Sequence, residues 1–167
     1  MKSLIGVYNT HDKAIKAIKL LKGENFPTKD ISMLGKTNVS ESVVDEKEPR
    51  IDKNDPSHEA PLAIGAIAGP ILGVLTGVGV FAIPGLGFLY GAGALVGALA
   101  GLDLGLVGGG IATLLATIGI SKKHHVKFKE YLKNGKVILI ARGKEEDIKR
   151  AHDTLVEYNE HHDLLTT

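Results

Sequence analysis

The stretch from Pro61 to Ile120 constrains the fold of this chain more than any other. It contains a single charged side chain, Asp103, and its glycines recur at every fourth position in two runs. On a helix, every fourth residue falls on nearly the same face, so each run would form a glycine stripe against which a second helix packs closely. The predicted helix-packing and assembly residues are Gly65, Gly69, Gly73 and Gly77 in the first run, and Gly93, Gly97, Gly101, Gly105 and Gly109 in the second.

The other residues of this stretch are mostly Ala, Leu, Ile and Val, which makes the remaining helix faces apolar as well. A helix that is apolar all round must be buried in protein or in a membrane. The sequence predicts a first helix from Leu62 to about Ala82 and a second helix that begins near Phe88. The predicted hairpin turn between them consists of Pro84, Gly85 and Gly87.

The residues before this stretch predict one β-α-β unit and a linker. Residues 3–8 are rich in β-formers and are typical of a strand, and the helix after them begins at the N-cap Thr10 and ends at Gly23. A second strand follows at residues 31–34. Residues 37–60 hold clustered acids and two prolines. This predicts a mobile acidic linker in preference to a calcium loop, because the spacing and central glycine of an EF-hand are missing.

The residues after the glycine-rich stretch predict the second half of the same domain. Ser121 is a natural N-cap for a helix over residues 122–132, which an Asn-Gly pair would close. A strand over residues 136–141 follows, and then a further helix. Residues 163–165 predict a final, short edge strand.

Without the inserted stretch, the elements run β-α-β, one helix, and β-α-β. This order predicts an α+β fold of the ferredoxin-like split β-α-β type, interrupted by a glycine-zipper helical hairpin. The predicted organisation is a first half of the α/β domain at 1–36, an acidic linker at 37–60, the hairpin at 61–120 and the second half of the domain at 121–167. The predicted core is Leu4, Ile5, Val7, Ile15, Ile18, Leu21, Ile31, Met33, Ile138, Ile140, Ile148 and Leu155.

Seven short motifs follow one another in a distinctive order along the chain. They are Gly6-Val7-Tyr8, Ala17-Ile18-Lys19-Leu20-Leu21, Asp30-Ile31-Ser32, Ile83-Pro84-Gly85, Gly119-Ile120-Ser121, Tyr131-Leu132-Lys133-Asn134-Gly135 and Val137-Ile138-Leu139-Ile140. In this order they resemble the bacterial general stress proteins of the 17M-like (YflT-type) family, in the long form with an inserted glycine-rich segment. The resemblance covers most of the chain outside the linker. It implies a stress-associated bacterial protein and offers no catalytic residue to carry over.

The sequence contains no constellation of residues that indicates a reaction. Without cysteine there are no disulfides, thiolate metal sites or cysteine nucleophiles, and a net charge of +1 gives no field that attracts nucleic acid. The paired histidines His124-His125 and His161-His162 would point about a hundred degrees apart on a helix, so they do not converge on one metal. We therefore expect a protein that is not an enzyme, with no catalytic residue, cofactor, metal or small-molecule substrate.

The predicted hairpin fits either lipid or a protein assembly. Both halves of the sheet must lie on one side of a bilayer, so complete crossings are even in number, and two spans with a tip at residues 83–85 satisfy this. Lysines after the second helix would then face the cytoplasmic membrane surface, as the positive-inside rule prefers. The predicted membrane-surface contacts are Lys122, Lys123, Lys127 and Lys129.

These features together predict a non-enzymatic stress-response protein in the cytoplasm, associated with the cytoplasmic face of the inner membrane. Its expected partners are membrane lipid and further copies of itself, which the hairpin would bring together. The alternative is a soluble homo-oligomer whose hairpins bury one another and enclose an apolar ligand. Asp103 would be a pore or oligomer contact if buried, but its flanking glycines favour a water-exposed turn between two shorter helices.

Overall fold

The computed structural model describes residues 2–36, 78–83, 87–93, 112, 115–116 and 119–167. Strands, α-helices and two short 3-10 helices (η) alternate along these ranges. In chain order they are β1 (Lys2–Tyr8), α1 (His11–Gly23), η1 (Thr28–Asp30), β2 (Ile31–Lys36), β3 (Val78–Ile83), β4 (Gly87–Gly93), η3 (Lys122–His124), α5 (His125–Lys133), β5 (Val137–Gly143), α6 (Glu145–Tyr158) and β6 (His161–Thr166).

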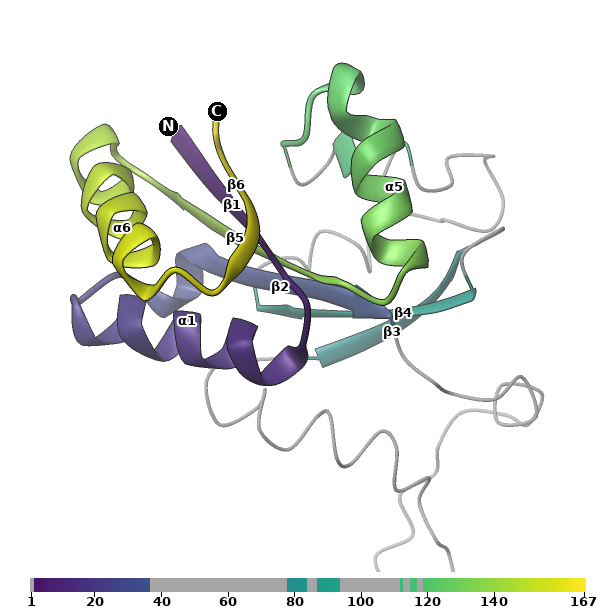
Figure 1. The fold of residues 1–167 in the computed structure, drawn as a ribbon, viewed down its shortest axis with the longest axis horizontal. Coiled ribbons are helices and arrows are strands. Elements are labelled where there is room, and N and C mark those ends of the chain that lie inside the picture. The colour runs from purple at the N-terminus through teal and green to yellow at the C-terminus, as the bar shows by residue number, and fades with distance from the viewer. Residues whose placement is uncertain (1, 37–77, 84–86, 94–111, 113–114, 117–118) are drawn as a thin grey trace, which may run out of the picture.

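The strands form one six-stranded sheet in the order β3-β4-β2-β5-β1-β6, and every neighbouring pair is antiparallel. β5 lies between β1 and β2, while β1 lies between β5 and β6 (Figure 1). Each of the two β-α-β units, β1-α1-β2 and β5-α6-β6, therefore holds a strand of the other unit between its own strands. The prediction of an α+β fold in which both halves of the chain share one sheet is confirmed.

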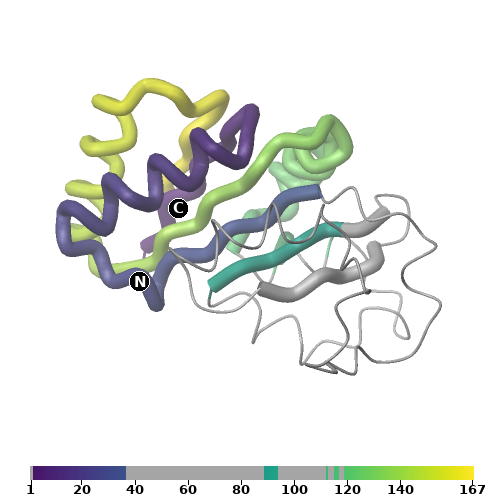
Figure 2. Tube along the Cα trace, turned by 90° about the horizontal axis from the view of Figure 1, so that it is seen from below, coloured from purple at the N-terminus to yellow at the C-terminus, as the bar shows by residue number. Residues whose placement is uncertain are grey.

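Helices cover both faces of this sheet. α1 and α6 lie together on one face, and α5 lies on the other (Figures 1 and 2). Because successive side chains of a strand point to opposite faces, β1 supplies both cores, with Leu4 and Tyr8 toward α1 and α6 and with Ile5 and Val7 toward α5. Burial on both faces explains why this strand is apolar without alternation. Every residue of the predicted core is buried.

Local signals in the sequence set most helix ends. The Thr10 hydroxyl accepts a hydrogen bond from the Lys13 amide at 3.4 Å, which is the predicted N-cap, and α1 ends at Gly23 as predicted. The helix predicted from residue 122 begins instead as the 3-10 turn η3, to which Ser121 gives no side-chain cap. After α5, Gly135 adopts a φ of +73°, a left-handed conformation that glycine tolerates best.

The prediction of helix is wrong for residues 78–82 and 88–93, which belong to the antiparallel strands β3 and β4. Glycine at every fourth position fits a strand as well as a helix. On a strand, every second side chain points to the same face, so every fourth one does as well. The β-branched and aromatic residues between the glycines, among them Val78, Val80 and Phe81, favour the strand. β4 then pairs with β2, which gives its backbone groups hydrogen-bond partners inside the sheet.

Gly93 has a different role from the predicted one. It does not belong to a helix stripe but ends β4 opposite Ser32, with a φ of +79°. A Cβ at this position would collide with the carbonyl oxygen of Ile31, so the close approach of the two strands requires glycine. Gly87, predicted in the turn, is the first residue of β4 and pairs with Ile83. The chain therefore reverses between Ile83 and Gly87, as predicted, but within a β-hairpin.

Most of the rest of the predicted helical hairpin lies outside the described residues. This applies to Gly65, Gly69, Gly73, Gly77, Pro84, Gly85, Gly97, Gly101, Asp103, Gly105 and Gly109, as well as to the acidic linker. Two membrane spans with a tip at residues 83–85 are ruled out, because the strands on both sides of that tip belong to the sheet. In the part of the chain that the structure describes, no helix has the length and apolar character needed to cross a bilayer.

Candidate functional site

Both glycine-rich segments are attached to the same end of the sheet. β3 begins at Val78, directly after the first segment, and Val78 pairs with Ala92, next to the last residue of β4. The segment that ends at residue 77 and the segment that begins at residue 94 are thus joined to neighbouring strands at the same level. This end of the sheet, which includes Val78, Gly93 and the first residues of β2, is here named the anchor end.

The second glycine-rich segment also returns to the anchor end. A Cβ placed on Gly119 would lie 3.8 Å from the Ser3 hydroxyl oxygen and 4.0 Å from a guanidinium nitrogen of Arg142. Ser3 and Arg142 are cross-strand partners in β1 and β5, one position beyond Ala141, which pairs with the first residue of β2. The chain between β4 and Gly119 therefore leaves and rejoins the domain at one end of the sheet.

Ile120 fixes the point of return. Its side chain is only 2% exposed and packs in the core under α5, together with the buried Leu115. Its amide donates to the Leu115 carbonyl at 2.9 Å, and the His125 Nε2 donates to the Ile120 carbonyl at 2.8 Å. The junction between the glycine-rich segment and α5 is thus held by both packing and hydrogen bonds.

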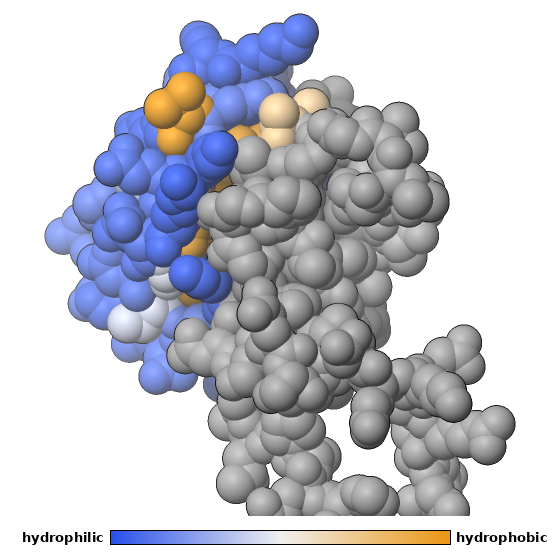
Figure 3. Space-filling view, turned by 90° about the vertical axis from the view of Figure 1, so that its right-hand side faces the viewer, coloured by the Kyte–Doolittle hydropathy of each residue, from blue (hydrophilic) through white to orange (hydrophobic). Residues whose placement is uncertain are grey.

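The lysines predicted to contact a membrane begin directly after this junction. Lys122 and Lys123 are exposed and Lys129 is half-buried, while Val126 between them is 80% exposed. These four residues are here named the basic patch. The described surface on this side of the molecule is mainly polar with a few apolar protrusions (Figure 3). A cationic surface with a projecting apolar side chain suits an anionic, partly apolar partner such as a lipid headgroup layer.

Lys127 has a different environment from the other predicted lysines. Its ammonium nitrogen lies 2.7 Å from Asp163 Oδ2 on the edge strand β6 and 5.6 Å from the centre of the Tyr131 ring. The Tyr131 hydroxyl donates to the same carboxylate at 3.2 Å. The Tyr131 ring also meets His162 edge-on, with ring centres 5.2 Å apart. Lys127 and Tyr131 therefore attach α5 to β6, and Lys127 is not part of the basic patch.

The charges of this contact reinforce one another. The hydrogen bond to Asp163 is the main reason that the pKa of Lys127 is raised. Burial acts to raise the pKa of Asp163, but the hydrogen bond and charge of Lys127, with help from Tyr131, lower it overall. Asp163 is therefore a stable carboxylate at neutral pH, which suits a structural ion pair and not a general acid.

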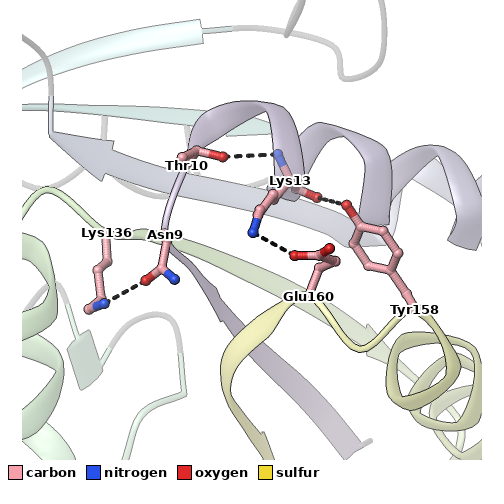
Figure 4. A network of polar contacts seen from close by, with 6 residues as sticks. All are labelled: Asn9, Thr10, Lys13, Lys136, Tyr158 and Glu160. Atoms are coloured by element: carbon pink, nitrogen blue, oxygen red, sulfur yellow. Dashed lines mark hydrogen bonds and ion pairs between the residues drawn. The ribbon is translucent and has the colours of Figure 1, made fainter.

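The opposite end of the sheet is closed by a polar network that joins α1 to both neighbouring connections (Figure 4). The Lys13 ammonium lies 2.5 Å from Glu160 Oε2, and the Tyr158 hydroxyl donates to the Lys13 carbonyl at 3.3 Å. The Lys136 ammonium donates to Asn9 Oδ1 at 2.6 Å. These contacts tie the start of α1 to the end of α6 and to the start of β5. They are structural, because each group already has its partner.

Two buried tyrosines were not anticipated from the sequence. The Tyr90 ring lies over Gly35 on the neighbouring strand and 5.2 Å from the His11 ring, while Tyr8 lies over Gly6 on its own strand. Burial raises the pKa of both tyrosines, so they stay neutral hydroxyls at physiological pH. Within the described ranges, neither hydroxyl has a hydrogen-bond partner. A bulky ring over a strand glycine fills the space that the missing side chain leaves, which identifies a packing role.

The histidines do not gather into a metal centre within the described ranges, where no three metal-ligating side chains converge. His124 Nδ1 lies 3.3 Å from the Ser121 hydroxyl, whereas His125 is bound to the Ile120 carbonyl. The predicted divergence of this pair is therefore visible in their different partners. His161 and His162 follow each other on β6, where neighbouring side chains point to opposite faces.

Comparison of the chain with protein-family models, with curated proteins and with solved structures gives no match.

Proposed function

We propose that this protein is not an enzyme and that it assembles with copies of itself at a membrane surface through its two glycine-rich segments. The α+β domain, with its ferredoxin-like split β-α-β arrangement, carries these segments and requires no cofactor. The order of motifs that resembles the 17M-like general stress proteins supports a role in the stress response and a cytoplasmic location. Its partners are then lipid and further copies of the chain.

The common attachment of the two segments at the anchor end carries this proposal. Val78 and Ala92 are cross-strand partners, so the two segments start from backbones about 5 Å apart. Glycines recur at every fourth position along both segments, at residues 65–77 and 97–109. Packing between small residues needs such a short separation, and the same stripes on two copies of the chain would form a homo-oligomer.

The sheet topology limits how these segments contact lipid. β3 and β4 belong to the same sheet as β1 and β2, so each segment begins and ends on the same side of a bilayer. Crossing the hydrocarbon layer and returning takes roughly 40 residues, at about 20 for each crossing. Residues 94–118 number 25, and the apolar residues 61–77 number 17. Insertion into the interfacial layer of one leaflet, without a crossing, is therefore the form of membrane contact that we propose.

The basic patch supports contact with an anionic leaflet. Lys122 and Lys123 follow the point where the second segment returns to the domain, so they lie close to any lipid that the segment touches. Each lysine near an anionic membrane surface contributes about 1 kcal/mol to binding at physiological salt. The exposed Val126 adds a small apolar contact.

The shortness of the segments also favours a second candidate function. A soluble homo-oligomer could bury the glycine-rich segments of several copies against one another and enclose an apolar ligand, with no lipid bilayer involved. This alternative needs the same attachment at the anchor end, but it makes the basic patch irrelevant to function.

Flotation of the purified protein with lipid vesicles distinguishes the two candidates. We expect the protein to float with vesicles that contain anionic lipid and to float less with neutral vesicles. A Lys122→Gln/Lys123→Gln variant should lose most of this difference, whereas the matched Lys19→Gln/Lys22→Gln variant on α1 should keep it. Protein that stays at the bottom of the gradient as a large lipid-free particle would reject membrane binding in favour of the soluble assembly.

Assembly is tested separately by glycine substitutions. We expect Gly73→Leu and Gly97→Leu to reduce the oligomer to smaller species in light scattering, because a leucine side chain separates the packed backbones. Gly23→Leu is the control, since no atom lies within 4 Å of a Cβ at that position. An oligomer of unchanged mass in both test variants would show that the glycine stripes do not mediate assembly.

A further inference from the structure

His11 brings an ionisable ring into contact with the core of the domain. It is the first residue of α1 and is half-buried, and its ring centre lies 5.2 Å from that of Tyr90 on β4. Tyr90 is 1% exposed and belongs to the core between α1 and the sheet. The two rings therefore join the start of α1 to β4, a contact that the proposed function does not use.

The surroundings of His11 favour the neutral form of its ring. The Nε2 atom is buried and, within the described ranges, has no hydrogen-bond partner. A protonated ring carries a hydrogen on both nitrogens, so Nε2 would become a buried donor without an acceptor. The helix N-terminus also carries a partial positive charge, which disfavours a cation at this position. In agreement, the pKa of His11 is lowered, chiefly by burial.

Few charged groups act against this preference. Asp12, the next residue on α1, acts to raise the pKa of His11, but burial outweighs it. The facing Tyr90 stays neutral, because burial raises its own pKa. On β2, Gly35 lies under the Tyr90 ring, and the next residue, Lys36, belongs to the other face of the sheet. The other titratable groups that make contacts around the start of α1 are Lys13, Lys136, Tyr158 and Glu160. Among the described residues, only Asp12 adds a charge effect to the pKa of His11.

We propose that the contact between His11 and Tyr90 is an acid-sensitive switch that holds β4 against α1. At neutral pH the uncharged ring packs against Tyr90. A ring that takes up a proton must move so that water reaches both nitrogens, and the contact opens. The opening is local, because Asn9 and Lys13 keep the start of α1 attached to β5 and α6.

The position of β4 gives this switch a consequence for the rest of the chain. β4 ends at Gly93, directly before the second glycine-rich segment, so opening weakens the strand from which that segment starts. The direction of the effect follows from linkage. The neutral ring stabilises β4 fully above about pH 6.5, the ordinary pKa of histidine, and this contribution is lost as the pH falls toward the lower folded pKa. The switch operates whether or not the segments bind lipid.

Two measurements on the full-length protein test the switch. NMR titration of the histidine ring protons gives the midpoint for His11, which we expect below the value of about 6.5 for an unfolded chain. Hydrogen exchange, corrected for the intrinsic effect of pH, compares the amides of β4 and β5 at about pH 7.5 and about pH 5.5. We expect protection of β4 to fall about threefold or more at the lower pH, with β5 unchanged. A midpoint at or above about 6.5, or an equal loss in both strands, would overturn the proposal.

Variants assign the effect to the His11 ring. His11→Phe keeps an aromatic ring that cannot take up a proton, so protection of β4 should be the same at both pH values. His11→Gln should also remove the pH dependence, but with lower protection of β4 throughout, because the ring contact is missing. His152→Gln on α6 is the matched control and should keep the loss at low pH. A folded His11→Phe variant whose β4 amides lose protection as the unmodified protein does would contradict the assignment.

Discussion

The two glycines Gly23 and Gly93 differ in how strongly the surrounding backbone requires a glycine. Gly23 and Gly93 both end a regular element, but only Gly93 has a positive φ and a carbonyl oxygen where a Cβ would lie. The glycine periodicity of the sequence correctly marks Gly93 as a position that needs glycine, but it assigns that need to helix packing. Its actual requirement comes from the neighbouring strand, which the sequence does not reveal.

Substitution of these two glycines should therefore have opposite effects. We expect Gly93→Ala to lower the free energy of unfolding by more than about 2 kcal/mol, because it combines a strained φ with a steric collision. Gly23→Ala should be neutral or stabilising by up to about 1 kcal/mol, since alanine favours the helix and has free space. Urea denaturation measures both values. Equal effects of the two substitutions would contradict the strand geometry at Gly93.

The buried tyrosine hydroxyls give a second pair of contrasting substitutions. Tyr90 is 1% exposed and its hydroxyl has no partner among the residues that the structure describes, so Tyr90→Phe should raise the free energy of unfolding by about 1 kcal/mol. Tyr158→Phe removes a hydroxyl that donates to the Lys13 carbonyl, so it should lower stability by about 0.5–1 kcal/mol. Thermal and urea unfolding give the comparison. Destabilisation by Tyr90→Phe would mean that its hydroxyl is bonded.

The ion pair between α5 and β6 predicts a pH dependence of stability. The pKa of Asp163 is lower in the folded protein than in the unfolded chain, so the carboxylate stabilises the fold above about pH 4. This contribution is lost as the pH falls through the folded pKa. Asp163→Asn should lower the free energy of unfolding by about 0.5–1 kcal/mol at pH 7 and by much less near pH 2.

The matched control for this ion pair is Asp153→Asn, whose side chain is 69% exposed. It should leave stability unchanged at both pH values. A deficit of Asp163→Asn that is the same at pH 7 and near pH 2 would show that shape, and not charge, makes the contribution.

At the scale of elements, local signals were sufficient where packing agrees with them. The cap at Thr10, the apolar spacing of α1 and the β-rich run of β5 predict these elements from the sequence, and the structure confirms them. Residues 78–82 and 88–93 were predicted as helix because they are apolar and adjoin the glycine repeats of residues 65–77 and 93–109, and an apolar run of this kind fits a helix or a strand. Only the pairing of β4 with β2 decides between the two, and this contact joins residues far apart in the chain.

Backbone chemical shifts test this assignment directly. We expect Cα and Cβ shifts typical of strands at residues 78–83 and 87–93, with Hα contacts between β2 and β4 that follow the pairing of Met33 with Ala92. The strands β1 and β5 serve as internal references. Helical shifts across residues 78–93 would show that β3 and β4 do not belong to the sheet. These residues would then be available for helices that span a membrane.

At the scale of the whole molecule, the sequence allowed the candidate site to be located only in part. The glycine repeats identify the segments, and the lysines after Ile120 identify the basic patch. Their common attachment at the anchor end could not be predicted, because it depends on the register of β3 against β4 and on the position of Gly119 beside β1. Lys127 could not be separated from the other lysines either, since its partner Asp163 lies on a distant strand.

In the membrane contact that we propose, the glycine-rich segments join one leaflet without crossing the bilayer. Sided labelling tests it most directly, because the chain has no cysteine and Asp103→Cys introduces a unique thiol in the second segment. The variant is bound to sealed anionic vesicles, floated, and treated from outside with a membrane-impermeant maleimide. We predict that the thiol of the floated protein is labelled from outside. If the thiol is buried in the outer leaflet, it should become labelled from outside once added salt weakens binding of the protein to the vesicles. A thiol that reacts only with reagent enclosed inside the vesicles would show a complete crossing and contradict the account.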